Sequence, residues 1–159
     1  MSLNVCVFGV SGYTGSKLLY YLNKHTKIKI VGVFGNSKVG ENLNEIHPSI
    51  KNLPKLKITN YKDFDFSKAD LVFSCLPPGL FQSKIIKNLD PNISVIDLSG
   101  DFRLENKIAY ENFYETSHKS FNLKDKFVYG LSEINRDVIK KSKFISNPGC
   151  YPTSILIPL

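Results

Sequence analysis

Gly9-Val10-Ser11-Gly12-Tyr13-Thr14-Gly15 is the stretch that decides the fold, because it joins the apolar run 4–10 to a periodic segment. In that segment Leu18 and Leu22 recur with Gly15 at the spacing of one helix face. A second β-branched run follows at 28–34. The order predicts a β-α-β unit, in which the crossover is right-handed and the two strands are parallel.

The same alternation continues along the chain. Strands are predicted over 56–59, 70–76, 94–98, 127–129 and 144–146, and helices over 80–89, over 133–141 and from Cys150 onward. Between 100 and 126 no periodicity is sustained, which indicates an excursion outside the sheet. The chain therefore predicts one α/β domain over 1–159, a doubly wound Rossmann-like parallel sheet, with 150–159 beginning the next helix.

Composition excludes several classes of protein. The 21 basic and 14 acidic residues give a net charge of +7, but all basic residues except Arg103 and Arg136 are Lys and they are dispersed, so nucleic-acid binding is not expected. No apolar run approaches the ~20 residues that cross a bilayer, and the start lacks a signal-peptide pattern, which predicts a cytoplasmic protein without a membrane segment. Three widely spaced cysteines predict neither a disulfide framework nor a metal site.

The glycine turn has the composition of a phosphate-binding loop. It stands between a strand and its helix, where backbone amides and the positive helix end favour a pyrophosphate. Gly9 permits a tight turn, Gly12 permits close approach to phosphate oxygens, and Gly15 lets the helix pack on the sheet. A glycine-rich turn without a ligand is the open alternative.

The end of the second predicted strand bears on which nucleotide binds. Folds that use NAD usually place an acidic residue there for the ribose 2′-hydroxyl, and the segment 35–38 has none. Ser37 and Lys38 instead offer a hydroxyl and a cation for a 2′-phosphate, which favours NADP. The alternative for Lys38 is one more surface lysine.

Among the three cysteines, Cys150 has the placement of a nucleophile. Cys6 and Cys75 lie in apolar strand runs and are expected to be inert core residues. Cys150 follows a Pro-Gly turn at a predicted helix start, where the helix dipole stabilises a thiolate. A thiolate in a dinucleotide fold suggests a thioester reduced by hydride, whereas a small residue that merely fills a turn is the alternative.

Four segments carry a family likeness: VFGVSGYTG at 7–15, DLSGDFRL at 97–104, YGLSEINR at 129–136 and NPGCYPT at 147–153. Together they resemble the N-acetyl-gamma-glutamyl-phosphate reductases of arginine biosynthesis. The resemblance implies NADPH-dependent reductive dephosphorylation of N-acetylglutamyl 5-phosphate, a small-molecule acyl phosphate, to the semialdehyde. It also matches Cys150 to the nucleophile of the family.

The remaining site residues follow from the chemistry that this reaction needs. Arg103 is a candidate for the substrate phosphate, and an ion pair with Asp101 or Asp97 is its alternative. Asn147 is expected either to fix the turn or to donate to the thioester oxygen. The expected set consists of catalytic Cys150 and Asn147, cofactor-binding Gly9, Ser11, Gly12, Tyr13, Thr14, Gly15, Ser37, Lys38 and Pro77, and substrate-binding Ser99 and Arg103.

The resemblance also predicts that part of the enzyme is missing. In the family, the acid/base histidine and much of the dimer surface come from a second domain after the cysteine helix, whereas this chain ends at Leu159. His25, His47 and His118 fall on no family motif. We therefore expect an incomplete portion with little or no activity, taken from a complete protein that is a homo-oligomer. A stand-alone NADP-binding module and a reductase of aminoadipyl or aspartyl phosphate are the alternatives.

Overall fold

The computed structural model, which describes residues 2–159, places the first predicted strand, β1 (Leu3–Phe8), between two parallel neighbours. The chain divides into two compact units. The first unit runs to Cys75 and includes 90–93, and the second comprises 76–89 and 94–159.

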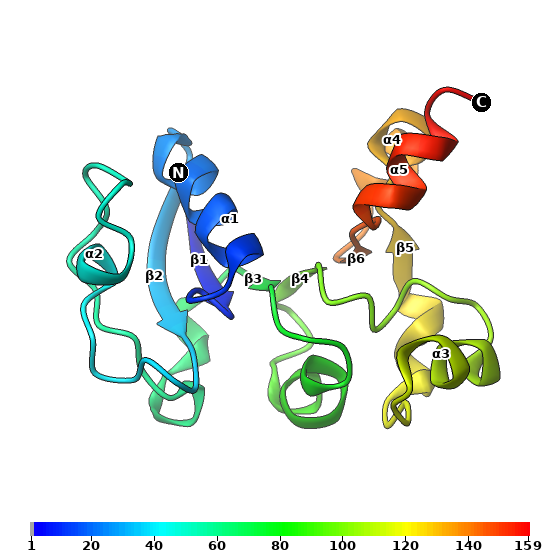
Figure 1. Ribbon diagram of the computed structural model, residues 1–159, viewed down its shortest axis with the longest axis horizontal. Coiled ribbons are helices and arrows are strands. Elements are labelled where there is room, and N and C mark those ends of the chain that lie inside the picture. Colours follow the sequence, from blue (N-terminus) through cyan, green and yellow to red (C-terminus); the bar gives the residue numbers. More distant parts are fainter. Residues whose placement is uncertain (1) are drawn as a thin grey trace. The chain divides into compact units, whose positions relative to one another are not determined.

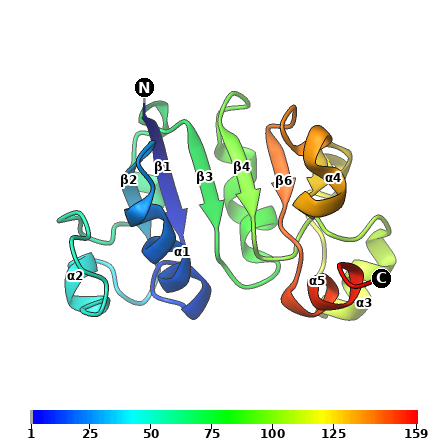
Figure 2. The same ribbon diagram turned by 90° about the horizontal axis from the view of Figure 1, so that it is seen from above.

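The first unit contains the predicted β-α-β arrangement. After β1 its elements are α1 (Tyr13–Lys24), β2 (Ile28–Phe34), α2 (Leu43–Ile46), the short 3-10 turns η1 (Tyr61–Asp63) and η2 (Phe66–Lys68), and β3 (Leu71–Ser74). Val7 of β1 pairs with Val33 of β2 and with Phe73 of β3, both in parallel. The arrows of β2, β1 and β3 lie side by side in Figure 2, and α1 lies against them.

Burial explains why this part of the chain folds as it does. Val5, Cys6 and Val7 are fully buried, as expected for a parallel strand covered on both faces. On one side an aromatic cluster closes the core, with the rings of Phe8 and Phe34 at 4.7 Å between centroids. Leu19 and Leu22 of α1 are also buried, which confirms the predicted apolar stripe.

The predicted strand at 56–59 is wrong. The segment makes only isolated bridges, Phe34 with Thr59 and Asn42 with Lys57. Its amides divide between two neighbours, because the N–H of Ile58 donates to Glu41 and that of Thr59 to Val33. Each side of the segment thus has a single bridge, and no continuous ladder forms.

The strands of the second unit are parallel as well. Its elements are η3 (Phe81–Ile85), η4 (Ile86–Asn88), β4 (Ser94–Asp97), α3 (Lys107–Tyr114), η5 (Phe121–Lys126), β5 (Phe127–Tyr129), α4 (Ser132–Ile139), β6 (Phe144–Ser146) and α5 (Cys150–Leu156). Ile145 of β6 pairs in parallel with Ile96 of β4 and Val128 of β5. The turn after β6 leads directly into α5, as Figure 1 shows.

Two predicted segments of this unit take a different form. The helix expected at 80–89 is a π-helical turn followed by a 3-10 turn, and the N–H of Gln82 in its first turn donates to Asp101. The excursion at 100–126 contains α3 and η5. Within residues 2–159, no helix has the length and apolar character that a membrane span requires.

Candidate functional site

The glycine turn owes its shape to backbone contacts that tolerate no side chain at two positions. Gly9 has a φ of 74°, a left-handed conformation that favours glycine, and its N–H donates to Phe34 at 2.9 Å. A Cβ on Gly15 would collide with the Gly9 carbonyl and lie 2.8 Å from the Cα of Val10. Gly12 has more room, because a Cβ there would lie 3.5 Å from its nearest neighbour, the carbonyl oxygen of Gly9.

The start of α1 has the features that a phosphate group requires. Gly12 is the N-cap, no described side chain caps the helix, and the first turn carries no acidic residue. Its first amides therefore have no competing carboxylate. Ser11, Tyr13 and Thr14 are exposed around this end, Tyr13 to 80%. These residues fit the pyrophosphate of a dinucleotide.

His47 supports the turn from behind, a role that the sequence did not reveal. The residue is buried, and its Nε2 lies 2.8 Å from the carbonyl oxygen of Val10. Because a carbonyl only accepts, Nε2 carries the hydrogen and donates. The contact joins residues 37 positions apart, so no local pattern could have indicated it.

Ser37 and Lys38 both lie exposed after β2. The ammonium of Lys38 forms an ion pair with the carboxylate of Glu41 at 3.0 Å. Both side chains are close to half exposed, so the pair contributes little free energy and competes weakly with a ligand.

Of the three thiols, that of Cys150 is the accessible one. Cys150 is exposed as the first residue of α5, Cys75 is half-buried, and Cys6 is buried. Burial raises the pKa of the Cys6 thiol to about 12, so this cysteine is a thiol at neutral pH. The expected inertness of Cys6 thus has a physical cause, and Cys150 is the most exposed of the three cysteines.

Arg103 ties its own loop to the turn that precedes Cys150. Its Nε donates to the carbonyl of Asn147 at 2.7 Å, and its Nη2 donates to the carbonyl of Leu98 at 2.9 Å. A Cβ on Gly149 would lie 3.2 Å from Nη1, so the guanidinium packs close to the backbone there. Both hydrogen bonds go to backbone carbonyl oxygens. The sequence had suggested either a substrate phosphate or the carboxylate of Asp101 or Asp97 as the partner of Arg103.

Asn147 fixes the same turn with its backbone and its side chain. Its N–H donates to the carbonyl of Asp97 at 2.7 Å, and its Nδ2 donates to the carbonyl of Pro148 at 3.0 Å. The hydroxyl of Thr153 closes the first turn of α5 by donating to Gly149 at 2.9 Å. Cys150 thus begins a helix whose preceding turn is held at several points.

Ser99 and Asp101 form the buried part of the loop. The hydroxyl of Ser99 donates to Asp97 at 2.6 Å and accepts from the N–H of Asp101 at 3.2 Å. The carboxylate of Asp101 accepts from the N–H of Gly79, which follows the exposed Pro77-Pro78 pair. Sequence reasoning considered Asp101 only as an ion-pair partner, so this contact was missed.

The two other histidines take no part in the expected site. His25 is exposed at the end of α1. His118 is buried in the second unit, where Nδ1 accepts from Ser120 and Nε2 donates to the carbonyl of Asp101. Burial lowers the pKa of His118, which keeps the ring neutral and structural.

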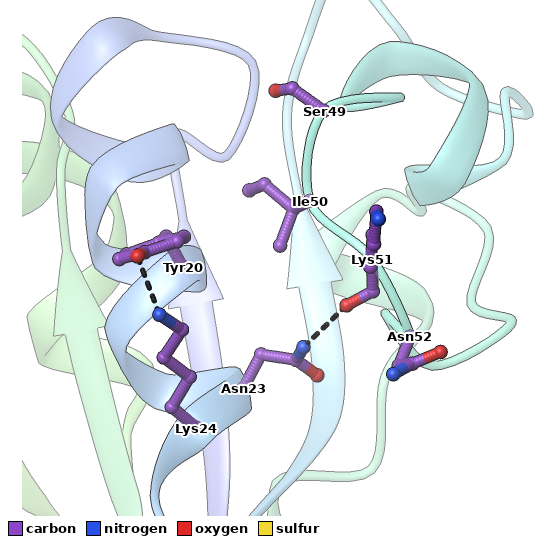
Figure 3. Close-up of a pocket in the computed structure, with 7 residues that line it drawn as sticks. All are labelled: Tyr20, Asn23, Lys24, Ser49, Ile50, Lys51 and Asn52. Atoms are coloured by element: carbon purple, nitrogen blue, oxygen red, sulfur yellow. Dashed lines mark hydrogen bonds between the residues drawn. The ribbon is translucent and has the colours of Figure 1, made fainter.

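A surface pocket of about 390 Å³ lies elsewhere on the first unit, beside the C-terminal half of α1 (Figure 3). None of the residues that line it belongs to the expected site. They are Tyr20, Asn23, Lys24, Ser49, Ile50, Lys51 and Asn52. The ammonium of Lys24 is already engaged there, by the Tyr20 hydroxyl at 2.5 Å and the face of the same ring. Asn23 bonds to the carbonyl of Lys51 at 2.9 Å.

The expected residues therefore divide between the units. The first unit holds the glycine turn with Ser37 and Lys38, and the second holds Pro77, Ser99, Arg103, Asn147 and Cys150. Within residues 2–159, the glycine turn at the start of α1 and the exposed cysteine at the start of α5 are therefore the features to compare with known proteins.

These features agree with the family of the chain. Residues 4–142 match the family model described as semialdehyde dehydrogenase, NAD binding domain, and the chain belongs to this family. Among curated relatives, it is 40% identical over 157 residues to a probable chloroplastic N-acetyl-gamma-glutamyl-phosphate reductase of Arabidopsis thaliana, covering 99% of this chain and 39% of the relative. It is 43% identical to the N-acetyl-gamma-glutamyl-phosphate reductase of Methanosphaera stadtmanae, covering 98% of this chain and 44% of the relative.

Solved structures agree on the fold. Aspartate semialdehyde dehydrogenase II from Vibrio cholerae superposes with a TM-score of 0.72 at 17% identity, over 99% of this chain and 45% of that chain. The aspartate semialdehyde dehydrogenase with NADP from Candida albicans gives 0.60 at 15% identity, over 99% and 46%. The predicted Rossmann-like α/β class is confirmed, and so is the resemblance to the N-acetyl-gamma-glutamyl-phosphate reductases. The chain spans 38 to 47% of the length of the curated relatives it matches.

Proposed function

We propose that this chain binds NADP(H) at its glycine turn and carries the nucleophile of an acyl-phosphate reductase at Cys150. The substrate is N-acetylglutamyl 5-phosphate and the product is the 5-semialdehyde. The observation that carries the proposal is the exposed Cys150, which begins α5 after a turn held by Arg103. The names of the relatives that match nearly the whole chain support the choice of substrate.

The chain supplies a thiolate, a fixed turn and hydrogen-bond donors to the reaction. The Cys150 thiolate attacks the acyl carbon, a C–S bond forms, and the bond to phosphate breaks as phosphate leaves. Bound NADPH supplies the hydride that reduces the resulting thioester. The thiohemiacetal then collapses to the aldehyde and the Cys150 thiolate, with the C–S bond breaking.

Arg103 and Asn147 act on the substrate side in this proposal. Arg103 uses Nε and Nη2 for carbonyls of the fold, and Nη1, close to Gly149, is the group that we assign to a phosphate oxygen. Asn147 holds the turn through Pro148 and is the candidate donor to the thioester oxygen. Ser99 contributes through its loop, because its hydroxyl proton is directed to Asp97.

On the cofactor side we propose NADP in preference to NAD. The pyrophosphate is bound by the glycine turn, through Gly9, Ser11, Gly12, Tyr13, Thr14 and Gly15. Pro77 contacts the nucleotide. The 2′-phosphate is bound by Ser37 and Lys38. The exposed end of α1 without a carboxylate supports the first assignment. The exposed Lys38 supports the last. A cytoplasmic homo-oligomer belongs to the same proposal for the complete protein.

The test is phosphate-dependent turnover by the product of the native gene. The assay follows NADPH formed from N-acetylglutamate 5-semialdehyde, NADP and phosphate, with aminoadipate and aspartate semialdehydes as competing substrates. We expect turnover with the N-acetylglutamyl compound and its loss in Cys150→Ala, with Cys75→Ala as the matched control. Turnover that survives Cys150→Ala would show that Cys150 is not the nucleophile, NADP binding without any turnover would support a binding module, and a preference for another semialdehyde would change the substrate.

A further inference from the structure

Asp101 lies at the centre of a buried hydrogen-bond cluster in the second unit. The residue is 1% exposed, and its carboxylate accepts from the N–H groups of Gly79 at 2.6 Å and Gln82 at 3.0 Å. A third bond comes from the hydroxyl of Tyr110 at 2.7 Å. Burial and the adjacent carboxylate raise the pKa of Tyr110, so its hydroxyl stays protonated and donates.

The two N–H groups belong to the start of the helical segment 80–88. Amides at such a start have no partner within their own helix. A carboxylate 19 and 22 positions away in sequence satisfies them here, and thereby fixes the turn that begins at Pro77. Charge-assisted bonds of this kind are stronger than neutral ones.

The backbone of Asp101 is held as firmly as its side chain. Its N–H donates to the hydroxyl of Ser99, and its carbonyl accepts from Nε2 of His118 at 2.7 Å. Arg103 follows two residues later and donates its own N–H to the carbonyl of Gly100. The position of Asp101 therefore determines where the Arg103 loop starts.

Gln82 extends the cluster to the segment 117–120. It is fully buried, and its Nε2 donates to the carbonyl of Ser117 at 2.9 Å. Its Oε1 accepts from the N–H of Lys119, and its carbonyl accepts from the hydroxyl of Ser120. The turn at Pro77 and the Arg103 loop are thus joined by one continuous set of buried bonds.

We propose that Asp101, assisted by Tyr110, is a positioning residue for the reaction. It holds two segments in fixed positions relative to each other: the turn at Pro77, on the cofactor side, and the loop of Arg103, on the substrate side. This inference rests on the proposed function, which assigns Pro77 to the nucleotide and Arg103 to the acyl phosphate. Asp101 contacts neither ligand in the proposal and acts through these two residues.

The test uses Asp101→Asn and Tyr110→Phe, both of which nearly preserve shape. In Asp101→Asn, the amide nitrogen replaces a carboxylate oxygen that accepts a hydrogen bond. This nitrogen is itself a donor and faces an N–H or O–H donor, so at least one hydrogen bond is lost. Titration with NADPH, well below the melting temperature, should show a dissociation constant about tenfold higher for Asp101→Asn and about threefold higher for Tyr110→Phe. Amide exchange should accelerate at Gly79, Gln82 and Arg103 together.

Two matched controls separate positioning from general stability. Asp65→Asn removes a carboxylate that accepts from Ser67 in an exposed turn of the first unit, and Tyr114→Phe removes a hydroxyl from the ring that packs on Tyr110. Neither should change NADPH affinity. Folded variants at Asp101 and Tyr110 that bind NADPH like the unaltered chain would overturn the proposal.

Two further outcomes are also decisive. If Asp101→Asn does not fold, the affinity of Tyr110→Phe decides the matter. If the unaltered chain binds no NADPH, the proposed function fails, and amide exchange then decides about positioning. Faster exchange at Gly79 and Gln82 with unchanged exchange at Arg103 would show that the two segments are not coupled.

Discussion

The guanidinium of Arg103 donates to the backbone carbonyl of Asn147, three residues before Cys150, at 2.7 Å. A second bond, to the carbonyl of Leu98, uses another nitrogen of the same planar group. Lysine carries the same charge but cannot direct two fixed donors at two carbonyls. The geometry explains why arginine stands here in a chain that otherwise uses lysine almost throughout.

Arg103→Lys should therefore destabilise the chain although it keeps the charge. Loss of the two hydrogen bonds to the carbonyls of Asn147 and Leu98 is expected to lower the free energy of unfolding by about 1–3 kcal/mol, as measured by urea denaturation. Amide exchange of Asn147 should accelerate as well. The matched control is Arg136→Lys on the exposed face of α4, which should change neither quantity. Equal effects of both substitutions would contradict a stabilising role of the two Arg103 hydrogen bonds.

Gly12 and Gly15 of the glycine turn should respond differently to a methyl group. Gly15→Ala places a Cβ against the backbone of Gly9 and Val10 and should lower the free energy of unfolding by about 1–3 kcal/mol. Gly12→Ala has room for its Cβ and should keep nearly the original stability. Because the proposed function places phosphate oxygens next to that methyl, Gly12→Ala should nevertheless lose NADPH affinity. Thermal unfolding and NADPH titration distinguish the two, and unchanged affinity in Gly12→Ala would argue against phosphate binding there.

Lys38 and Glu41 offer a paired test of nucleotide preference. Lys38→Ala removes the cation and should weaken NADPH binding by a few-fold, about 1 kcal/mol, while leaving NADH binding unchanged. Glu41→Gln removes the competing carboxylate, 3.0 Å from the Lys38 ammonium, and should tighten NADPH binding. Titration of both nucleotides with both variants checks the prediction. Equal changes for NADPH and NADH in Lys38→Ala would rule out a contact with the 2′-phosphate.

His118 predicts a loss of stability in mild acid. Burial lowers its pKa in the folded chain from the ordinary 6.5, so the unfolded chain binds the proton more readily. The stability that this residue contributes is fully present above pH 6.5 and is lost as the pH falls towards its folded pKa. Urea midpoints measured across this range should fall more steeply for the unaltered chain than for His118→Gln. His25→Gln, at an exposed position, should retain the steep fall.

Local spacing was sufficient to predict the parts of the fold that depend on neighbours in sequence. The glycine turn and its flanking elements follow from positions a few residues apart, and both β1 and α1 lie where the pattern indicated. The prediction of a strand at 56–59 failed, because the segment makes a single bridge to each of two neighbours, Asn42 and Phe34. Apolar alternation does not indicate how far the pairing with a neighbouring segment continues.

The contacts of the candidate site could not be predicted from the sequence. Arg103 stood out as an arginine among lysines, yet its partners are backbone carbonyls, which leave no trace in side-chain identity. The hydrogen bond between His47 and Val10 joins residues 37 positions apart, and that between Asp101 and Gly79 joins residues 22 positions apart. Contacts of that separation depend on the tertiary fold, and the sequence alone contains no spacing that indicates them.

The most direct measurement of the central claim is a single turnover without phosphate. With the product of the native gene, N-acetylglutamate 5-semialdehyde and NADP, oxidation should stop at the thioester, because phosphate is absent to release the acyl group. We predict a burst of one NADPH per chain and an N-acetylglutamyl group on Cys150, located by peptide mass spectrometry and removable by hydroxylamine. A burst with Cys150 unmodified, or no burst at all, would contradict the account.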